Sequence, residues 1–188
     1  MALKRATEIP TIDCVLVVIT QKNGEISYAL DTASQVGVEP NIETTDAVQL
    51  IIKGVLKAQK PAQNTITGNT ITLTDNVFTP EIVQIMQGGT ITYDTEDTTK
   101  VVGYKPPVAG SKEVLEPFTL TTYSAQYDAS GQIVQYEKTD YPNCTGQPVA
   151  FSTEDGVFRA PEYTIVSAPK KGESPYDMTY IKELPVVS

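Results

Sequence analysis

Residues 68–94 have the sequence GNTITLTDNVFTPEIVQIMQGGTITYD and carry the one clear change of periodicity in the chain. Threonines alternate with Ile71 and Leu73 at the start of the stretch and with Ile91 and Tyr93 at its end. A period of two is typical of half-buried strands. The two ends of the stretch are therefore predicted to be strands.

A short helix is predicted between these strands, over residues 79–87. Thr79 suits the N-cap and Pro80 the first helical position. Gly88 and Gly89 suit the end of the helix, where left-handed backbone is common. The chain thus goes from strand to helix and back within one continuous stretch.

This helix has one apolar face, which needs a partner. The residues on that face are Ile82, Val83, Ile85 and Met86. A helix shorter than roughly 12 residues is marginal in water by itself. We therefore expect the four side chains to pack on a sheet.

The whole chain of 188 residues is long enough for one well-buried domain and short for two. Thr, Tyr, Val and Ile recur throughout, and these residues favour strands. We expect a mainly β protein over residues 1–188, with an N-terminal arm at 1–10 and a C-terminal tail at 172–188.

Composition argues against several functions. A net charge of −9 and a pI near 4.5 would repel nucleic acid and anionic membranes. The absence of histidine from the sequence removes the commonest general base and a common metal ligand, so we expect no enzyme and no cofactor. Lys4 and Arg5 are followed by Glu8 and Pro10 rather than an apolar run, so we expect no export signal and a cytoplasmic origin.

The two cysteines, Cys14 and Cys144, have no metal-ligand spacing. Two buried thiols are the simpler interpretation, and a disulfide between an early and a late strand is the alternative.

The first half of the chain predicts several further strands. Residues 12–20 and 26–30 form a predicted hairpin around the Asn-Gly signal at 23–24. Residues 35–42 contain Gly37 and Pro40, which favours an edge strand or a loop margin.

Residues 44–60 fit either a helix or a long strand. The strand is preferred because Gly54 could form a bulge that bends a long hairpin arm. Pro61 would end a helix at residue 60 equally well, so the helix remains the alternative.

The second half predicts a hairpin of residues 118–127 and 132–139 around Gly131. The acidic segment 94–99 lacks the pattern of a calcium loop and is expected to be a solvated turn. Shorter strands are expected at 148–152, 157–159 and 163–167. The segments 104–116 and 172–188 are expected to order only against a neighbouring subunit.

Three parts of the sequence resemble a phage tail tube protein, also called a major tail protein. They are the strand–helix–strand unit 68–92, the hairpin YSAQYDASG at 123–131, and Asp155-Gly156-Val157-Phe158 leading to Ala160-Pro161-Glu162-Tyr163. The inner tube of a contractile tail or of a phage-derived bacteriocin is a related possibility.

The resemblance implies a β-sandwich or half-barrel with one short flanking helix. Such subunits join through long hairpins into rings, expected to be hexameric, that stack into a hollow tube. The implied partners are other copies of the chain, the tail initiator or baseplate, the tape measure and the tail terminator. DNA would pass through without specific binding, in a virion tail assembled in the host bacterial cytoplasm and with no membrane involved.

Within such a tube, Glu43, Asp46, Gln135 and Glu137 are candidates to face the lumen. Glu43 and Asp46 have opposite parity, so a regular strand would expose only one of them there. The alternative is that these residues coat the outer surface. Tyr180, Ile181 and Leu184 are candidates for contacts between subunits.

Two other function classes remain open from the sequence. A secreted carbohydrate-binding module or adhesin would be a β-sandwich, although the chain has no Trp for a sugar platform. A hydrolase with paired carboxylates is the third, and the acidic residues show no such pairing.

Overall fold

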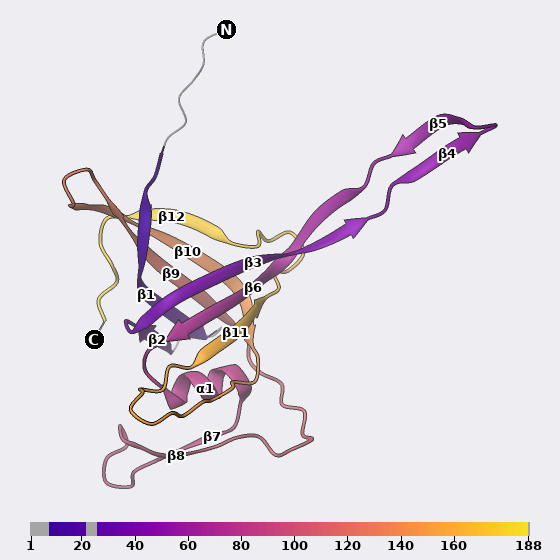
Figure 1. The fold of residues 1–188 in the computed structure, drawn as a ribbon. Coiled ribbons are helices and arrows are strands. Elements are labelled where there is room, and N and C mark those ends of the chain that lie inside the picture. Colours follow the sequence, from indigo (N-terminus) through magenta and orange to yellow (C-terminus); the bar gives the residue numbers. More distant parts are fainter. Residues whose placement is uncertain (1–7, 22–25, 188) are drawn as a thin grey trace.

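The computed structural model describes residues 8–21 and 26–187, and it is mainly β (Figure 1). The strands are β1 (Thr11–Gln21), β2 (Ser27–Leu30), β3 (Ala33–Thr45), β4 (Val48–Ile52), β5 (Val55–Lys60), β6 (Gln63–Asp75), β7 (Thr90–Tyr93), β8 (Val101–Lys105), β9 (Phe118–Tyr127), β10 (Ile133–Gly146), β11 (Glu162–Ser167) and β12 (Asp177–Ile181). The helix within the described residues is α1 (Pro80–Gln87). The predicted class, mainly β with one short helix, is confirmed.

One antiparallel sheet organises the molecule, in the order β2-β1-β9-β10-β11-β6-β3. Strand β12 joins it by pairing with β10. The sheet curls so that β3 returns close to β1 without pairing to it, as in an open half-barrel. Two small hairpins, β4-β5 and β7-β8, lie outside this sheet.

Most of the buried apolar side chains form one cluster, on the concave face of the sheet. Val17 and Ile19 of β1, Leu120 of β9 and Ile71 of β6 are fully buried there. Helix α1 covers the lower end of this concave face in Figure 1. The helix thereby closes one end of the half-barrel core.

Helix α1 follows the sequence prediction closely. Its four predicted packing residues are buried, which confirms the apolar face: Ile82, Val83, Ile85 and Met86. Thr79 holds the N-cap position, although its side chain makes no capping bond. Gly88 and Gly89 follow the helix with φ of 81° and 97°, a region that glycine adopts without strain.

Both predicted hairpins of the main sheet are present. β1 pairs with β2, and the Asn-Gly turn expected at 23–24 lies outside the described residues, as do residues 1–7 of the expected N-terminal arm. β9 pairs with β10 around a turn in which Asp128 Oδ1 accepts the backbone N–H groups of Ser130 and Gln132. Gly131 closes that turn with φ of 80°.

The long hairpin from β3 to β6 corrects one prediction. Residues 35–42 belong to the edge strand β3, as expected, and the strand interpretation of residues 44–60 is right. Gly54, however, does not bend one long strand. Lys53 and Gly54 have φ of 50° and 77° and form a two-residue turn between β4 and β5, because a tight hairpin needs positive φ at both positions.

Two predicted strands differ from the structure, and one strand of the structure was not predicted. Residues 157–159 are not a strand, and residues 148–152 contribute only an isolated bridge from Ala150 to Glu162. Strand β8 was not expected, because its residues follow the acidic turn and contain Gly103. The expected strand at 163–167 is β11, and 94–99 is a turn as predicted.

The segments expected to order only against a neighbour contact their own chain. In the tail, β12 pairs with residues 136–140 of β10, and Asn69 Nδ2 donates to the Pro175 carbonyl at 2.9 Å. In the segment 104–116, Glu113 Oε2 accepts the Gly89 N–H at 3.1 Å. That prediction is therefore wrong for these parts of the two segments.

Candidate assembly surface

The most prominent surface feature is the arm hairpin, which we define as residues 48–60, the β4–β5 unit. It continues the β3–β6 ladder and projects far from the core (Figure 1). Residues 46–47 and 61–62 lie between the two ladders and belong to no strand. Every residue of the arm hairpin is exposed.

The arm hairpin is apolar although water surrounds it. Between 47% and 65% of each large apolar side chain is exposed, for Val48, Leu50, Ile51, Ile52, Val55 and Leu56. Register places Leu50 and Ile52 on one face, opposite Ala58 and Val55, and Ile51 on the other face, opposite Leu56. Both faces of the hairpin tip are therefore apolar, which is the pattern of a strand pair that is covered on both sides.

The sequence predicts the strands of the arm hairpin but not its apolar surface. The apolar residues of 44–60 were assigned to a strand, but none was named as a contact residue. The missed signal is that Ile51 and Ile52 are adjacent, so that both parities of one strand are apolar. A strand with one solvated face would show apolar and polar residues in alternation.

The four lumen candidates lie in two separate places. Glu43 is exposed on β3, and Asp46 is exposed in the break between β3 and β4. Gln135 and Glu137 share the concave side of β10. There Gln135 Nε2 donates to Gln126 Oε1 at 2.8 Å, and Thr11 Oγ1 donates to Glu137 Oε2 at 3.4 Å.

A polar cavity of about 430 Å³ opens beside Glu137, between β1, β3, β9 and β10. Its lining includes the hydroxyls of Thr122, Ser124 and Thr139 and the thiol of Cys14. No group of three or more Cys, Asp or Glu side chains within residues 8–21 and 26–187 is placed to hold a metal ion. The hydroxyls have no histidine partner to activate them, since the sequence contains none.

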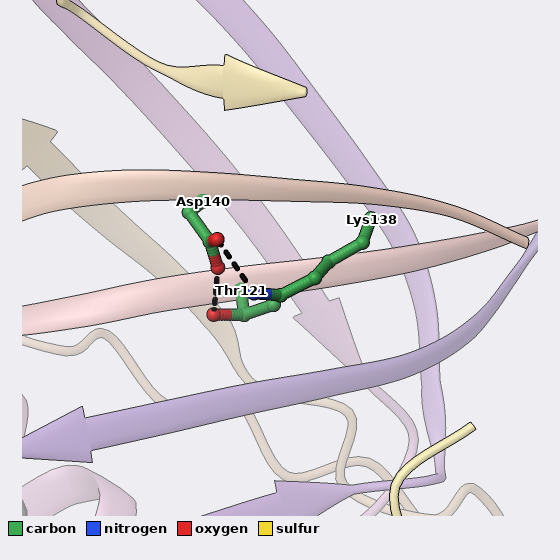
Figure 2. Close-up of polar contacts among 3 residues, drawn as sticks. All are labelled: Thr121, Lys138 and Asp140. Carbon is green, nitrogen blue, oxygen red and sulfur yellow. Dashed lines mark hydrogen bonds and ion pairs between the residues drawn. The ribbon is translucent and has the colours of Figure 1, made fainter. Parts of the chain in front are cut away.

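The opposite, convex side of β10 carries an ion pair that sequence analysis missed (Figure 2). Lys138 Nζ lies 2.7 Å from Asp140 Oδ2, and Thr121 Oγ1 of β9 donates to Asp140 Oδ1 at 2.6 Å. The hydrogen bond to Asp140 raises the pKa of Lys138. The signal was the spacing of two residues between Lys138 and Asp140, which puts both on one face of a strand.

The three candidates for contacts between subunits lie in the tail. Tyr180 and Ile181 pair through β12 with Glu137 and Tyr136 of the same chain. The Tyr180 side chain is exposed, and Leu184 is half-buried beyond the end of the strand. Their backbones are thus used within the subunit, and their contact with a neighbour stays a prediction.

The two cysteines are free thiols. Burial raises the pKa of Cys14, and it raises the pKa of Cys144 to about 11. Cys144 Sγ also lies 3.2 Å from the Tyr141 carbonyl, to which the thiol donates. Both groups are therefore protonated at neutral pH and behave as small apolar side chains.

No helix in the described part of the chain is long and apolar enough to cross a bilayer.

Comparison with known proteins gives matches in structure only. No family model matches the sequence, and no curated protein matches it. One chain of the sheath-tube complex of PVC, an extracellular contractile injection system in its extended state, aligns with 12% identity and a TM-score of 0.45 over 93% of each chain. A chain of the six-fold symmetrised baseplate of the anti-feeding prophage (AFP) aligns with 8% identity and a TM-score of 0.35, over 96% of this chain and 98% of that one.

Proposed function

We propose that this protein is a structural virion protein that polymerises as stacked hexameric rings and forms the hollow tail tube through which phage DNA passes. The arm hairpin is the single observation that carries the proposal. It carries apolar side chains on both faces of its tip, and these are exposed in the isolated chain.

An isolated two-stranded hairpin is marginally stable in water, and large exposed apolar surfaces mark sites of association. The open edges of the hairpin and of β3 add unpaired backbone groups that can pair with another chain. Copies that join through such arms in a head-to-tail manner close into a ring when the rotation between them allows it. Ring closure removes the edges that a single subunit exposes.

In the family that the sequence resembles, the inner tube of a contractile tail or of a phage-derived bacteriocin is built from subunits of the same architecture as the tail tube. The proposal therefore includes it as the second form of the same function. A surrounding sheath distinguishes the two forms, and co-expression with a sheath protein from the same genome tests for it.

Within the proposed tube, Glu43 or Asp46 and the pair Gln135 and Glu137 face the lumen. Tyr180, Ile181 and Leu184 contact a neighbouring subunit. Tail initiator, tape measure and terminator proteins are the other proposed partners, in a particle assembled in the bacterial cytoplasm.

Negative-stain electron microscopy of the concentrated protein tests this function, alone and with its initiator complex. We expect rings or hollow tubes. A matched variant lacks the arm: residues 46–62 are replaced by Asn-Gly, which joins Thr45 to Gln63, the last pair of the β3–β6 ladder, by a two-residue turn.

We expect the armless variant to unfold with unchanged cooperativity, because the arm makes no part of the core, and to form no rings. A second variant keeps the arm but removes its apolar surface, through Leu50→Thr, Ile52→Thr and Val55→Thr together. Threonine preserves the strand propensity, and we expect this variant to form no rings either. Monodisperse wild-type protein under every condition, combined with binding on a glycan array, would favour the carbohydrate-binding alternative.

A further inference from the structure

The arm hairpin differs in charge from the rest of the chain. It contains Lys53, Lys57 and Lys60, three of the chain's 14 basic residues, and none of its 23 acidic residues. The arm hairpin therefore carries +3, while the remainder carries −12. An apolar and basic hairpin fits a surface that is apolar and acidic.

Such a surface lies at the other end of the molecule, on the loop between β10 and β11. We call residues 151–158 the aromatic loop. Its base is fixed by stacking: the rings of Phe151 and Phe78 lie 5.3 Å apart in an edge-to-face arrangement. The Arg159 guanidinium lies 5.1 Å from the Phe78 ring centre and 5.6 Å from that of Phe151, and Nη2 donates to Thr153 Oγ1 at 2.9 Å.

The tip of the aromatic loop is both apolar and acidic. A turn in which the Val157 N–H donates to the Glu154 carbonyl at 3.3 Å presents Val157 and Phe158 outward. Phe158 is 93% exposed, and Glu154 and Asp155 beside it are exposed as well. A large aromatic side chain held in water by an ordered loop is a mark of a contact site.

The arm hairpin and the aromatic loop cannot meet within one chain. The arm projects away from α1, whereas the aromatic loop is anchored at Phe78, the residue that precedes the helix N-cap (Figure 1). Two surfaces at opposite ends of one chain that complement each other produce a heterologous contact, which repeats from copy to copy.

We propose that the arm hairpin of one copy docks on the aromatic loop of a second copy, with Lys53 and Lys57 facing Glu154 and Asp155 and with Phe158 covered by the apolar arm. This inference rests on the self-assembly proposed above and names its two contacting surfaces. The charged rim fixes the register of the contact, and the apolar residues exclude water from its centre.

The turn between β7 and β8 is the competing acidic surface at this end of the molecule. It is less suited, because Asp94 Oδ1 and Asp97 Oδ1 already accept hydrogen bonds from Glu96 N–H and Thr99 within the turn. Its nearest aromatic residue, Tyr93, is only 41% exposed. In the aromatic loop the two carboxylates are exposed, and the aromatic side chain of Phe158 is far more exposed than that of Tyr93.

Charge reversal on each surface tests the contact. We expect Lys53→Glu with Lys57→Glu, and separately Glu154→Lys with Asp155→Lys, to raise the protein concentration needed for assembly by about tenfold or more. Combining all four substitutions in one chain should restore that concentration to within about threefold of wild type, because the pairs are attractive again. Sedimentation and electron microscopy measure assembly, and circular dichroism of the monomer checks folding.

Two further variants make the test specific. Glu96→Lys with Asp97→Lys makes the same charge change on the competing turn and should shift the assembly concentration by less than about threefold. Phe158→Ser should weaken assembly and leave the melting temperature of the monomer unchanged, since this side chain makes no part of the core.

The outcomes separate this inference from the proposed function. If wild-type protein forms tubes and the aromatic-loop variants assemble equally well, the docking site is wrong while the tube function stands. The inference is also overturned if the variant with all four substitutions assembles no better than the double variants. It is overturned as well if Glu96→Lys with Asp97→Lys raises the assembly concentration more than Glu154→Lys with Asp155→Lys does. If the wild type never assembles, even with its initiator, the proposed function itself fails.

Discussion

Gly146 lies where strand β10 passes directly against the backbone of α1. A Cβ atom added there would overlap the Cα and carbonyl oxygen of Met86, which belong to the helix backbone and cannot rotate away. Gly37 on the edge strand β3 is the natural contrast. A Cβ atom there would meet only Thr72, at 3.9 and 4.0 Å, which is ordinary contact.

We predict that Gly146→Ala lowers the free energy of unfolding by about 3 kcal/mol, the upper part of the usual range for overpacking. Gly37→Ala should be neutral or stabilise by up to about 1 kcal/mol, because it reduces the entropy of the unfolded chain. Urea unfolding of both variants measures the difference. Equal stability of the two variants would show that α1 moves freely on β10.

Cys144 provides a prediction about pH. Burial raises the pKa of its thiol from the ordinary value of 9.0 to about 11. A group whose pKa is higher in the folded state stabilises the fold below its unfolded pKa and loses that contribution as the pH rises through the folded pKa. The relevant window is therefore pH 9 to 11.

Between pH 8 and pH 11, wild-type protein should lose about 2 kcal/mol more stability than Cys144→Val, which cannot ionise. Tyr141 and Tyr163, whose pKa values burial also raises, are present in both proteins and cancel in the comparison. The measurement is urea unfolding under reducing conditions. Parallel losses in the two proteins would mean that the thiol ionises as easily in the fold as in water.

The sequence predicts those helices and strands whose ends are marked by local capping or turn residues. Helix α1 and the β9–β10 hairpin have caps and turns within a few residues of the pattern they end, and both are present. β12 has no such signal: its five residues lie between prolines in an apparent tail, and only pairing with a strand some 40 residues earlier makes them a strand. Lys53-Gly54 fits a bulge as well as a turn, since both use positive φ.

The residues of the candidate site divide in the same way, into those that a local pattern predicts and those that it does not. The helix packing residues follow from periodicity, because burial within one chain repeats every turn. The lumen and contact residues depend on neighbouring copies, which leave no periodic mark on a single chain. Phe158 shows the limit, since one exposed aromatic residue in a loop looks the same in sequence as a buried one.

We predict that removing residues 175–188 lowers stability by about 2 kcal/mol, or roughly 4–8 °C in Tm. The truncation deletes the Pro175 carbonyl that accepts from Asn69, the ring of Tyr176 that lies 6.1 Å from that of Tyr141, and all of β12. Removing only residues 186–188 is the control and should change little, since Val186 is 95% exposed. Thermal unfolding distinguishes the two. An unchanged Tm in the longer truncation would mean that β12 adds nothing to the isolated subunit.

The net charge of the chain has a consequence for the proposed tube. A ring of six copies would carry −54, from −9 for each chain. Acidic walls of a narrow channel lie within about one Debye length of its contents, roughly 8 Å at physiological salt, so they repel DNA phosphates. DNA would therefore slide without adhering.

We predict that Glu43→Lys with Glu137→Lys leaves tubes intact but slows DNA ejection, because lysines in the lumen attract phosphates. The matched control, Glu96→Lys with Asp97→Lys, makes the same change in net charge on exposed residues of the β7–β8 turn and should eject normally. Ejection kinetics of particles assembled with each variant provide the measurement. Equal rates from the two variants would place Glu43 and Glu137 outside the lumen.

The pairing of β1 with β9 has a consequence for synthesis in the cell. Val17 pairs with Leu30 of β2 on one side and with Thr122 of β9 on the other, so the second partner of β1 leaves the ribosome only about a hundred residues after β1 itself. The β3–β6 hairpin and its arm pair locally and can form during that interval. The exposed apolar arm is therefore present before the domain is complete, and we expect its three lysines to disfavour association between nascent chains by charge repulsion.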